Sequence, residues 1–187
     1  MSGIRAGLRL VWCPGTTFSQ DELVVDNDAD LLAVLRELDD PDWLERPRSY
    51  DLGAAAARFA RLTARLEADF AASTTSEQDV QDSSEYGRVL VPAEATGRGT
   101  RIVVCVSKFG SLAVICAENP GAFFGTRDAL AEGALDSADL ATVHKALTES
   151  GYTVVPEELL ESDYDGPSRL GWHVQRPTWS ARFFGFY

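Results

Sequence analysis

Residues 101–117 have the sequence RIVVCVSKFGSLAVICA, in which two apolar, β-branched runs flank a short turn. Residues 102–106 and 112–116 are typical of strands, and Lys108-Phe109-Gly110-Ser111 between them has the composition of a hairpin turn. Successive residues of both runs are apolar, so both faces of these strands should be covered by protein. The stretch predicts two central strands of an antiparallel sheet.

Neighbouring segments should extend this sheet. Apolar residues 89–91 are joined to the first run by a turn-rich stretch, TGRGT, at 96–100. Alternation of apolar and polar residues predicts a strand near 6–13, and shorter runs at 23–25 and 152–155 add candidates.

Helical periodicity is clearest over residues 51–72, where apolar side chains recur at steps of three and four and arginines occupy the other faces. Asn27 or Asp28 can cap a helix that runs to about residue 38, and Asp136 or Ser137 can open another that Gly151 ends. A helical turn is expected at 157–160, after a proline.

Two further segments complete the expected fold. Residues 73–86 are rich in Ser, Thr, Asp, Glu and Gln, which predicts a flexible acidic loop. Residues 179–187 are unusually aromatic, which favours a terminus docked into the core, with an exposed partner patch as the alternative. At 187 residues the chain fits one domain. We predict a single α+β domain over 1–187, with a mainly antiparallel sheet of four to six strands and three or more helices.

Negative charge is unevenly distributed in this chain of net charge -12. Residues 21–51 include eleven acidic and three basic residues, and residues 128–165 include ten acidic residues and one basic residue. Residues 71–87 include four acidic residues and no basic one. A single sign of charge bears on solubility and choice of partner rather than on fold. No run approaches the ~20 apolar residues of a membrane span or the apolar core of a secretory signal, and the three cysteines lack close spacing. These features predict a protein of the reducing cytoplasm that binds neither membrane nor nucleic acid.

Motifs for catalysis or metal binding fail at the positions that their chemistry requires. Residues 26–37 copy the acidic ligands of a calcium loop but have Leu31 where glycine is needed, and 161–172 has Trp172 in place of the final glutamate. The GRGT sequence at 97–100 precedes a strand rather than a phosphate-binding helix. His144 and His173 belong to no metal or nucleophile motif, although a Cys/His pair assembled by the fold stays open. We therefore expect no cofactor, no metal and no catalytic residues.

Two clusters combine acids with aromatic residues, as a binder of a basic protein requires. The candidate partner-binding residues of the first acidic cluster are Asp39, Asp40, Asp42 and Trp43, beside Glu45. Those of the second acidic cluster are Glu157, Glu158, Glu161, Asp163, Tyr164 and Asp165.

The carboxyl-terminal part carries a resemblance to known proteins. Residues 151–160 (GYTVVPEELL), Tyr164-Asp165-Gly166 and residues 178–184 (TWSARFF) resemble small acidic actinobacterial proteins, some of them similar to immunity proteins of polymorphic toxin systems. The resemblance covers about the last fifty residues. It implies a cytoplasmic, non-enzymatic antitoxin that occludes its cognate toxin, and it assigns no site residue.

Three functions therefore stay open. The leading hypothesis is an immunity protein whose acidic surface covers a basic effector, with carboxylates that mimic phosphates. The alternative is a small-ligand-binding protein or enzyme with a pocket between helix 51–72 and the sheet. A third is a regulatory partner that docks through its aromatic end. The sequence leaves oligomeric state open.

Overall fold

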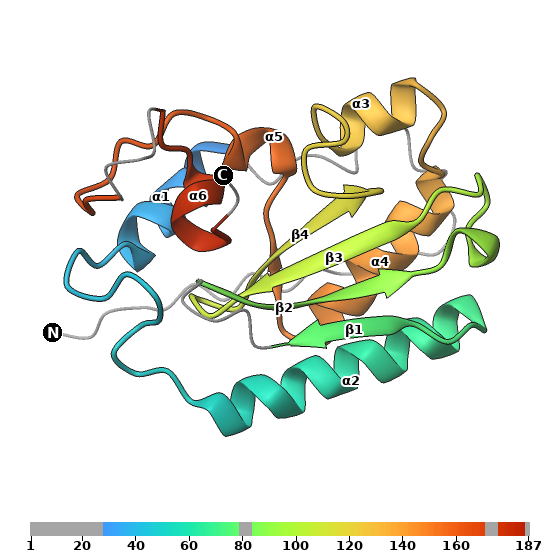
Figure 1. Cartoon of the computed structure of the whole chain (residues 1–187), viewed down its shortest axis with the longest axis horizontal. Coiled ribbons are helices and arrows are strands. Elements are labelled where there is room, and N and C mark those ends of the chain that lie inside the picture. The colour runs from blue at the N-terminus through green and yellow to red at the C-terminus, as the bar shows by residue number, and fades with distance from the viewer. Residues whose placement is uncertain (1–27, 79–83, 171–175, 186–187) are drawn as a thin grey trace, which may run out of the picture.

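A five-stranded sheet in the order β1-β2-β3-β4-β5 organises the protein (Figure 1). The computed structural model describes residues 28–78, 84–170 and 176–185. The strands are β1 (Thr75–Gln78), β2 (Glu85–Val91), β3 (Ile102–Ser107), β4 (Leu112–Ala117) and β5 (Thr153–Val154). The first three pairings are antiparallel, and β5 pairs parallel to β4. The fold is α+β with a mainly antiparallel sheet, as the sequence predicts.

Helices lie on both sides of this sheet. Their bounds are α1 (Asp28–Leu38), α2 (Leu52–Phe70), α3 (Thr126–Ala131), α4 (Ser137–Glu149), α5 (Glu157–Leu160) and α6 (Trp179–Phe183), with a 3-10 turn, η2, at Ala93–Ala95. The four longest predicted helical segments are confirmed to within a few residues. The short helices α3 and α6 were not predicted, because six and five residues are too few to show a period.

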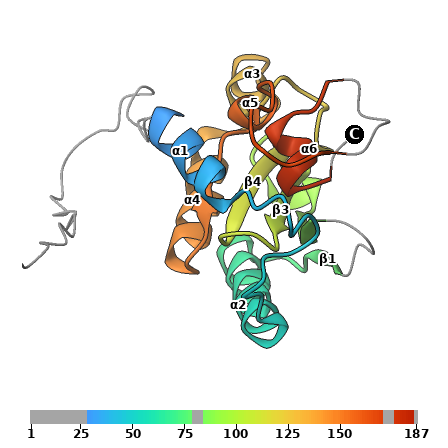
Figure 2. The same cartoon turned by 90° about the vertical axis from the view of Figure 1, so that its left-hand side faces the viewer.

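One face of the sheet packs against α2 and α4. Val104 and Ile115 from the central strands meet Phe59 and Leu66 of α2 and Val143 of α4 in one buried cluster. Figure 2 shows α4 on one side of β3 and β4 and α6 on the other. The N-cap of α2 is the Asp51 carboxylate, which accepts the Ala54 N–H.

The opposite face packs against α1, α5 and α6. Cys105 and Val114 meet Leu35 of α1, Leu160 of α5 and Phe183 of α6 in a second buried cluster. Every residue of β3 and β4 is buried, which confirms the expected cover on both faces. Trp179, Phe183 and Phe184 are almost fully buried, so this part of the aromatic end belongs to the core. Phe186 and Tyr187 lie outside the described residues.

The prediction of a loop at 73–86 is wrong at both ends, where the structure has strands. Residues Thr75–Gln78 form the edge strand β1, and Ser84, Glu85 and Tyr86 are buried at the start of β2. The polar strand forms because β2 supplies its backbone partners while all four of its side chains face solvent. Glu85 is buried because it pairs with Arg88 at 2.7 Å. Residues 79–83, and the strands predicted at 6–13 and 23–25, lie outside the described part of the chain.

Among the described residues, no helix has the length and apolar character of a membrane span.

Candidate functional site

The two acidic clusters, far apart in sequence, meet in the structure. The Tyr164 hydroxyl donates a hydrogen bond to Oδ2 of Asp39, at the end of α1. Arg36 of α1 pairs with Asp165 at 2.7 Å. The sequence predicted both clusters but not their contact.

Arg182 of α6 is the centre of this contact. Its side chain is fully buried, and its Nε donates to Asp39 Oδ1 at 2.5 Å. Its terminal nitrogens donate to three backbone carbonyls, those of Leu44 at 2.9 Å, Trp43 at 3.2 Å and Asp40 at 3.3 Å. The guanidinium also lies over the rings of Phe109 and Phe183. We call this set, with Tyr164 and Ser168, the Arg182 network.

Asp39 is the only carboxylate that the described residues bring to Arg182, and three side chains donate hydrogen bonds to it. Ser168 Oγ and the Tyr164 hydroxyl donate to it as well as Arg182. Burial favours the neutral acid, but the hydrogen bonds from Ser168, Tyr164 and Arg182 and the charge of Arg182 together hold the pKa of Asp39 below its ordinary value. The structure therefore withdraws Asp39 from the predicted contact surface.

Glu157 and Glu158 also have internal partners. Glu157 is buried and its Oε1 accepts the Gly121 N–H at 2.8 Å, while Oε1 of Glu158 accepts the Arg127 N–H at 2.8 Å. Burial raises the pKa of Glu157, against the opposing effect of the Gly121 and Cys116 hydrogen bonds. Glu157 thus holds the segment between β4 and α3, and Glu158 holds the first turn of α3, so neither is a free contact residue.

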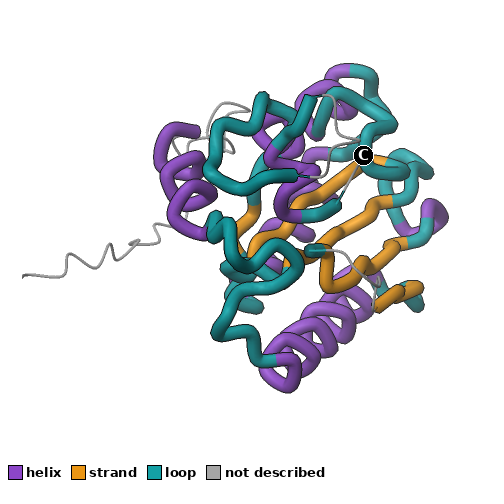
Figure 3. The backbone as a smooth tube through the Cα atoms, turned by 60° about the vertical axis from the view of Figure 1, so that its left-hand side comes forward, coloured by secondary structure: helices purple, strands orange, loops and turns teal. Residues whose placement is uncertain are grey.

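Residues 40–45, which we call the Trp43 loop, keep their side chains at the surface. Asp40 and Asp42 are exposed, and Trp43 and Leu44 are 39% and 43% exposed. The Asp40 carboxylate accepts the Asp42 N–H at 2.9 Å, which forms a local turn. Because Arg182 binds three carbonyls of the same loop, its backbone is fixed while its side chains face solvent. Figure 3 shows how this region runs from α1 toward α2 as loop.

Charge around the Trp43 loop is negative but mixed. The exposed side chains include four acids and two bases; the acids are Glu37, Asp40, Asp42 and Glu45, and the bases are Arg46 and Arg48. From the second acidic cluster, Glu161, Asp163 and Asp165 are exposed, and Arg36 lowers the pKa of Asp165 through its hydrogen bond. The exposed remainder of the two clusters is the candidate partner surface.

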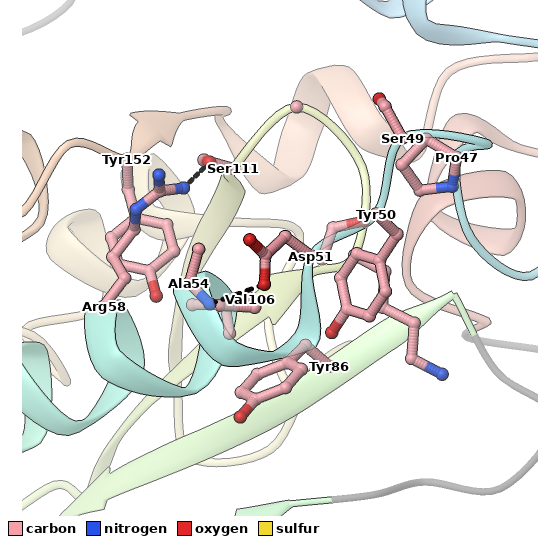
Figure 4. A pocket seen from close by; sticks show the side chains of 14 residues that line it. Pro47, Ser49, Tyr50, Asp51, Ala54, Arg58, Tyr86, Val106, Ser111 and Tyr152 are labelled. Atoms are coloured by element: carbon pink, nitrogen blue, oxygen red, sulfur yellow. Dashed lines mark hydrogen bonds between the residues drawn. The ribbon is translucent and has the colours of Figure 1, made fainter.

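A second candidate site is a pocket of about 250 Å³ between the start of α2 and the sheet. We call it the tyrosine pocket, because Tyr50, Tyr86 and Tyr152 line it (Figure 4). Arg58, Lys108, Ser111 and Asp51 add charged and polar groups. It lies where the alternative hypothesis placed a pocket.

The polar groups of the tyrosine pocket are held in place. Arg58 donates to the Ser111 hydroxyl, and its guanidinium lies 5.7 Å from the centroid of the Tyr152 ring. Burial raises the pKa of Tyr152. None of the tyrosines was selected from the sequence, because they come from separate segments that only the fold brings together.

Among the described residues, no three His, Cys, Asp or Glu side chains gather closely enough to hold a metal ion.

Comparison of the chain with protein-family models, with curated protein sequences and with solved structures finds no match in any of the three.

Proposed function

We propose that this protein is a non-enzymatic binding protein of the cytoplasm that covers a basic protein partner, in the manner of an immunity protein that neutralises its toxin. The observation that carries the proposal is the Trp43 loop, whose exposed side chains stand on a backbone fixed by a buried arginine.

An exposed tryptophan next to an exposed leucine is the kind of anchor that dominates protein interfaces. Trp43 and Leu44 are two of the five large hydrophobic side chains that are exposed among the described residues. Because Arg182 already holds the carbonyls of both residues, binding would order little additional backbone. The loop is thus prepared to bury its side chains against a partner.

Exposed carboxylates around the anchor supply the charge complementarity. Asp40, Asp42 and Glu45 flank Trp43, and Glu161 and Asp163 extend the negative surface, whereas Asp165 is paired with Arg36. Such carboxylates speed encounter with a basic surface and would occupy sites that hold phosphate groups in a nuclease-type partner.

The first experiment compares two exposed aromatic residues. Immobilised wild type, Trp43→Ala and Phe124→Ala are used to capture proteins from the native host, and each captured protein is purified and its affinity measured. Phe124 is the matched control, because it is 89% exposed and lies outside both acidic clusters. We expect Trp43→Ala to weaken binding by about 2 kcal/mol, or ~30-fold, and Phe124→Ala to leave it unchanged.

Charge is tested on the same purified pair. In the triple variant Asp40→Asn, Asp42→Asn, Glu45→Gln, the association rate should fall more than the dissociation rate rises, and added salt should slow wild type in the same way. A partner that binds Trp43→Ala as tightly as wild type, at a rate independent of salt, would rule the proposal out.

A further inference from the structure

The tyrosine pocket is lined by aromatic, cationic and polar side chains that are not part of the proposed protein-binding surface. We propose that it binds a small organic anion that carries a flat ring, with the acidic group on Arg58 and Ser111 and the ring against the tyrosines. This site is independent of the Trp43 loop and goes beyond the function proposed above.

Arg58 is the anion-binding group. Its NH1 donates to the Ser111 hydroxyl, and the ring of Tyr152 lies beneath the guanidinium. Within the described residues, Arg58 has no ion pair with a carboxylate inside 4.0 Å. A guanidinium fixed in orientation but lacking a carboxylate keeps its remaining N–H donors for a planar acidic group.

The backbone of Ser111 explains how its hydroxyl is held on the wall of the pocket. Its φ is 55°, in the left-handed region that a residue other than glycine rarely adopts. Gly110, the residue before it, shares that region at 54°. These are the two central positions of the hairpin turn between β3 and β4, which the Leu112 N–H closes by donating to the Phe109 carbonyl at 3.0 Å, and the turn places the Ser111 hydroxyl where it orients Arg58.

The charge of the lining favours an anion even though the whole chain has a net charge of -12. The lining includes two cationic side chains, Arg58 and Lys108, and one carboxylate, Asp51. Asp51 is partly engaged, because its Oδ1 accepts the Ala54 N–H at 3.0 Å. The charge of Arg58, which no carboxylate of the described residues neutralises within 4.0 Å, therefore favours small anions at this end of the pocket.

Size and shape restrict the rest of the ligand. Figure 4 shows Arg58 and Tyr152 toward one end of the pocket, Tyr50 toward the other and Asp51 between them. The Tyr86 ring is fixed edge-on by Phe59, with centroids 5.3 Å apart. A volume of about 250 Å³ with aromatic walls suits one ring with a short acidic substituent. Asp51 additionally favours a ligand with a hydrogen-bond donor remote from its acidic group.

Three single-ring probes test this chemistry by calorimetry. Phenyl phosphate and 4-hydroxybenzoate present a phosphate and a carboxylate, and 4-hydroxybenzamide is the neutral control; inorganic phosphate is the anion without a ring. We expect at least one ring-bearing anion to bind about tenfold more tightly than both the neutral amide and inorganic phosphate. The anion that binds more tightly identifies whether the pocket prefers a phosphate or a carboxylate.

Two arginines of the same helix supply the matched variants. Arg58→Gln should weaken binding of the anion about tenfold and leave the affinity for the neutral amide unchanged. Arg61 is exposed and lies outside the lining, so Arg61→Gln should change neither affinity. If thermal unfolding shows that Arg58→Gln is not folded, Ser111→Ala takes its place, because loss of the hydroxyl frees the guanidinium and should weaken the anion severalfold.

The inference is overturned if the amide binds as well as the anions, if no probe binds, or if the glutamine variants at 58 and 61 weaken binding equally.

Discussion

Two arginines of this protein lie on aromatic rings, yet their surroundings differ. The side chain of Arg182 is fully buried, pairs with Asp39 and donates hydrogen bonds to three backbone carbonyls. Arg58 rests on Tyr152 and donates to Ser111, with no carboxylate partner among the described residues. A buried arginine paired with a carboxylate and bonded to three carbonyls stabilises the fold, whereas an arginine that lacks a carboxylate partner can bind an anionic ligand. Similar side chains on similar rings therefore point to different roles.

Removing Arg182 should have the largest effect. Arg182→Met retains apolar volume but leaves the Asp39 carboxylate without its cationic partner and the carbonyls of 40, 43 and 44 without the donors that Arg182 supplies. Breaking a buried pair in this way costs about 3–5 kcal/mol of unfolding free energy. Urea unfolding followed by circular dichroism measures the loss.

Arg36→Met is the control for that variant, since it removes an arginine from an exposed pair with Asp165 and should hardly move the urea midpoint. Equal losses from the two variants would contradict the central place of Arg182.

A smaller effect should distinguish two buried acids by pH. The folded-state pKa of Asp39 lies below the ordinary 3.8, so its contribution to stability is complete above that pH and is lost as pH falls through the lower folded value. The pKa of Glu157 is raised from 4.5, so its contribution is complete at acid pH and is lost as pH rises through the higher folded value.

The contributions of Asp39 and Glu157 to stability therefore change in opposite directions as the pH falls. Asp39→Asn should lower stability at neutral pH by about 1–3 kcal/mol and make its decline toward acid shallower than in wild type. Glu157→Gln should make the acid decline steeper. Urea midpoints measured from about pH 6 to pH 2 decide this, and parallel curves for the two variants would refute the assignment.

Arg58→Gln should have only a small effect on stability, within about 1 kcal/mol, because a partly buried arginine without a carboxylate partner among the described residues contributes little to the fold. The urea midpoint measures it in the absence of ligand. A loss as large as that of Arg182→Met would show that Arg58 is a structural residue like Arg182.

Local patterns account for what the sequence predicts well. The apolar runs of β3 and β4 and the three- and four-residue steps of α2 are set by burial along one segment, which is visible in one window of sequence. The strand β1 shows no such pattern, because its partner β2 rather than its own side chains holds it in the sheet.

The sites were harder to predict, because contacts between distant segments decide them. Asp39 has the composition of a surface acid, and only its pairing with Arg182, 143 residues away, makes it a buried one. Trp43 was selected for its acidic neighbours, although a distant arginine fixes its backbone. Arg58 was read as one of several arginines on the outer faces of α2, since the β3–β4 turn that supplies Ser111 is assembled only by the fold.

The separation of Arg182 from the Trp43 loop also has a consequence for synthesis of the chain. Trp43 and its carbonyl partner Arg182 are 139 residues apart. The loop is translated early, but it cannot take its native shape until residue 182 has left the ribosome and packed behind it. Under the proposed function, a nascent chain that displays Trp43 is not yet competent to bind, and acquisition of binding by stalled chains of increasing length would mark the moment when α6 docks.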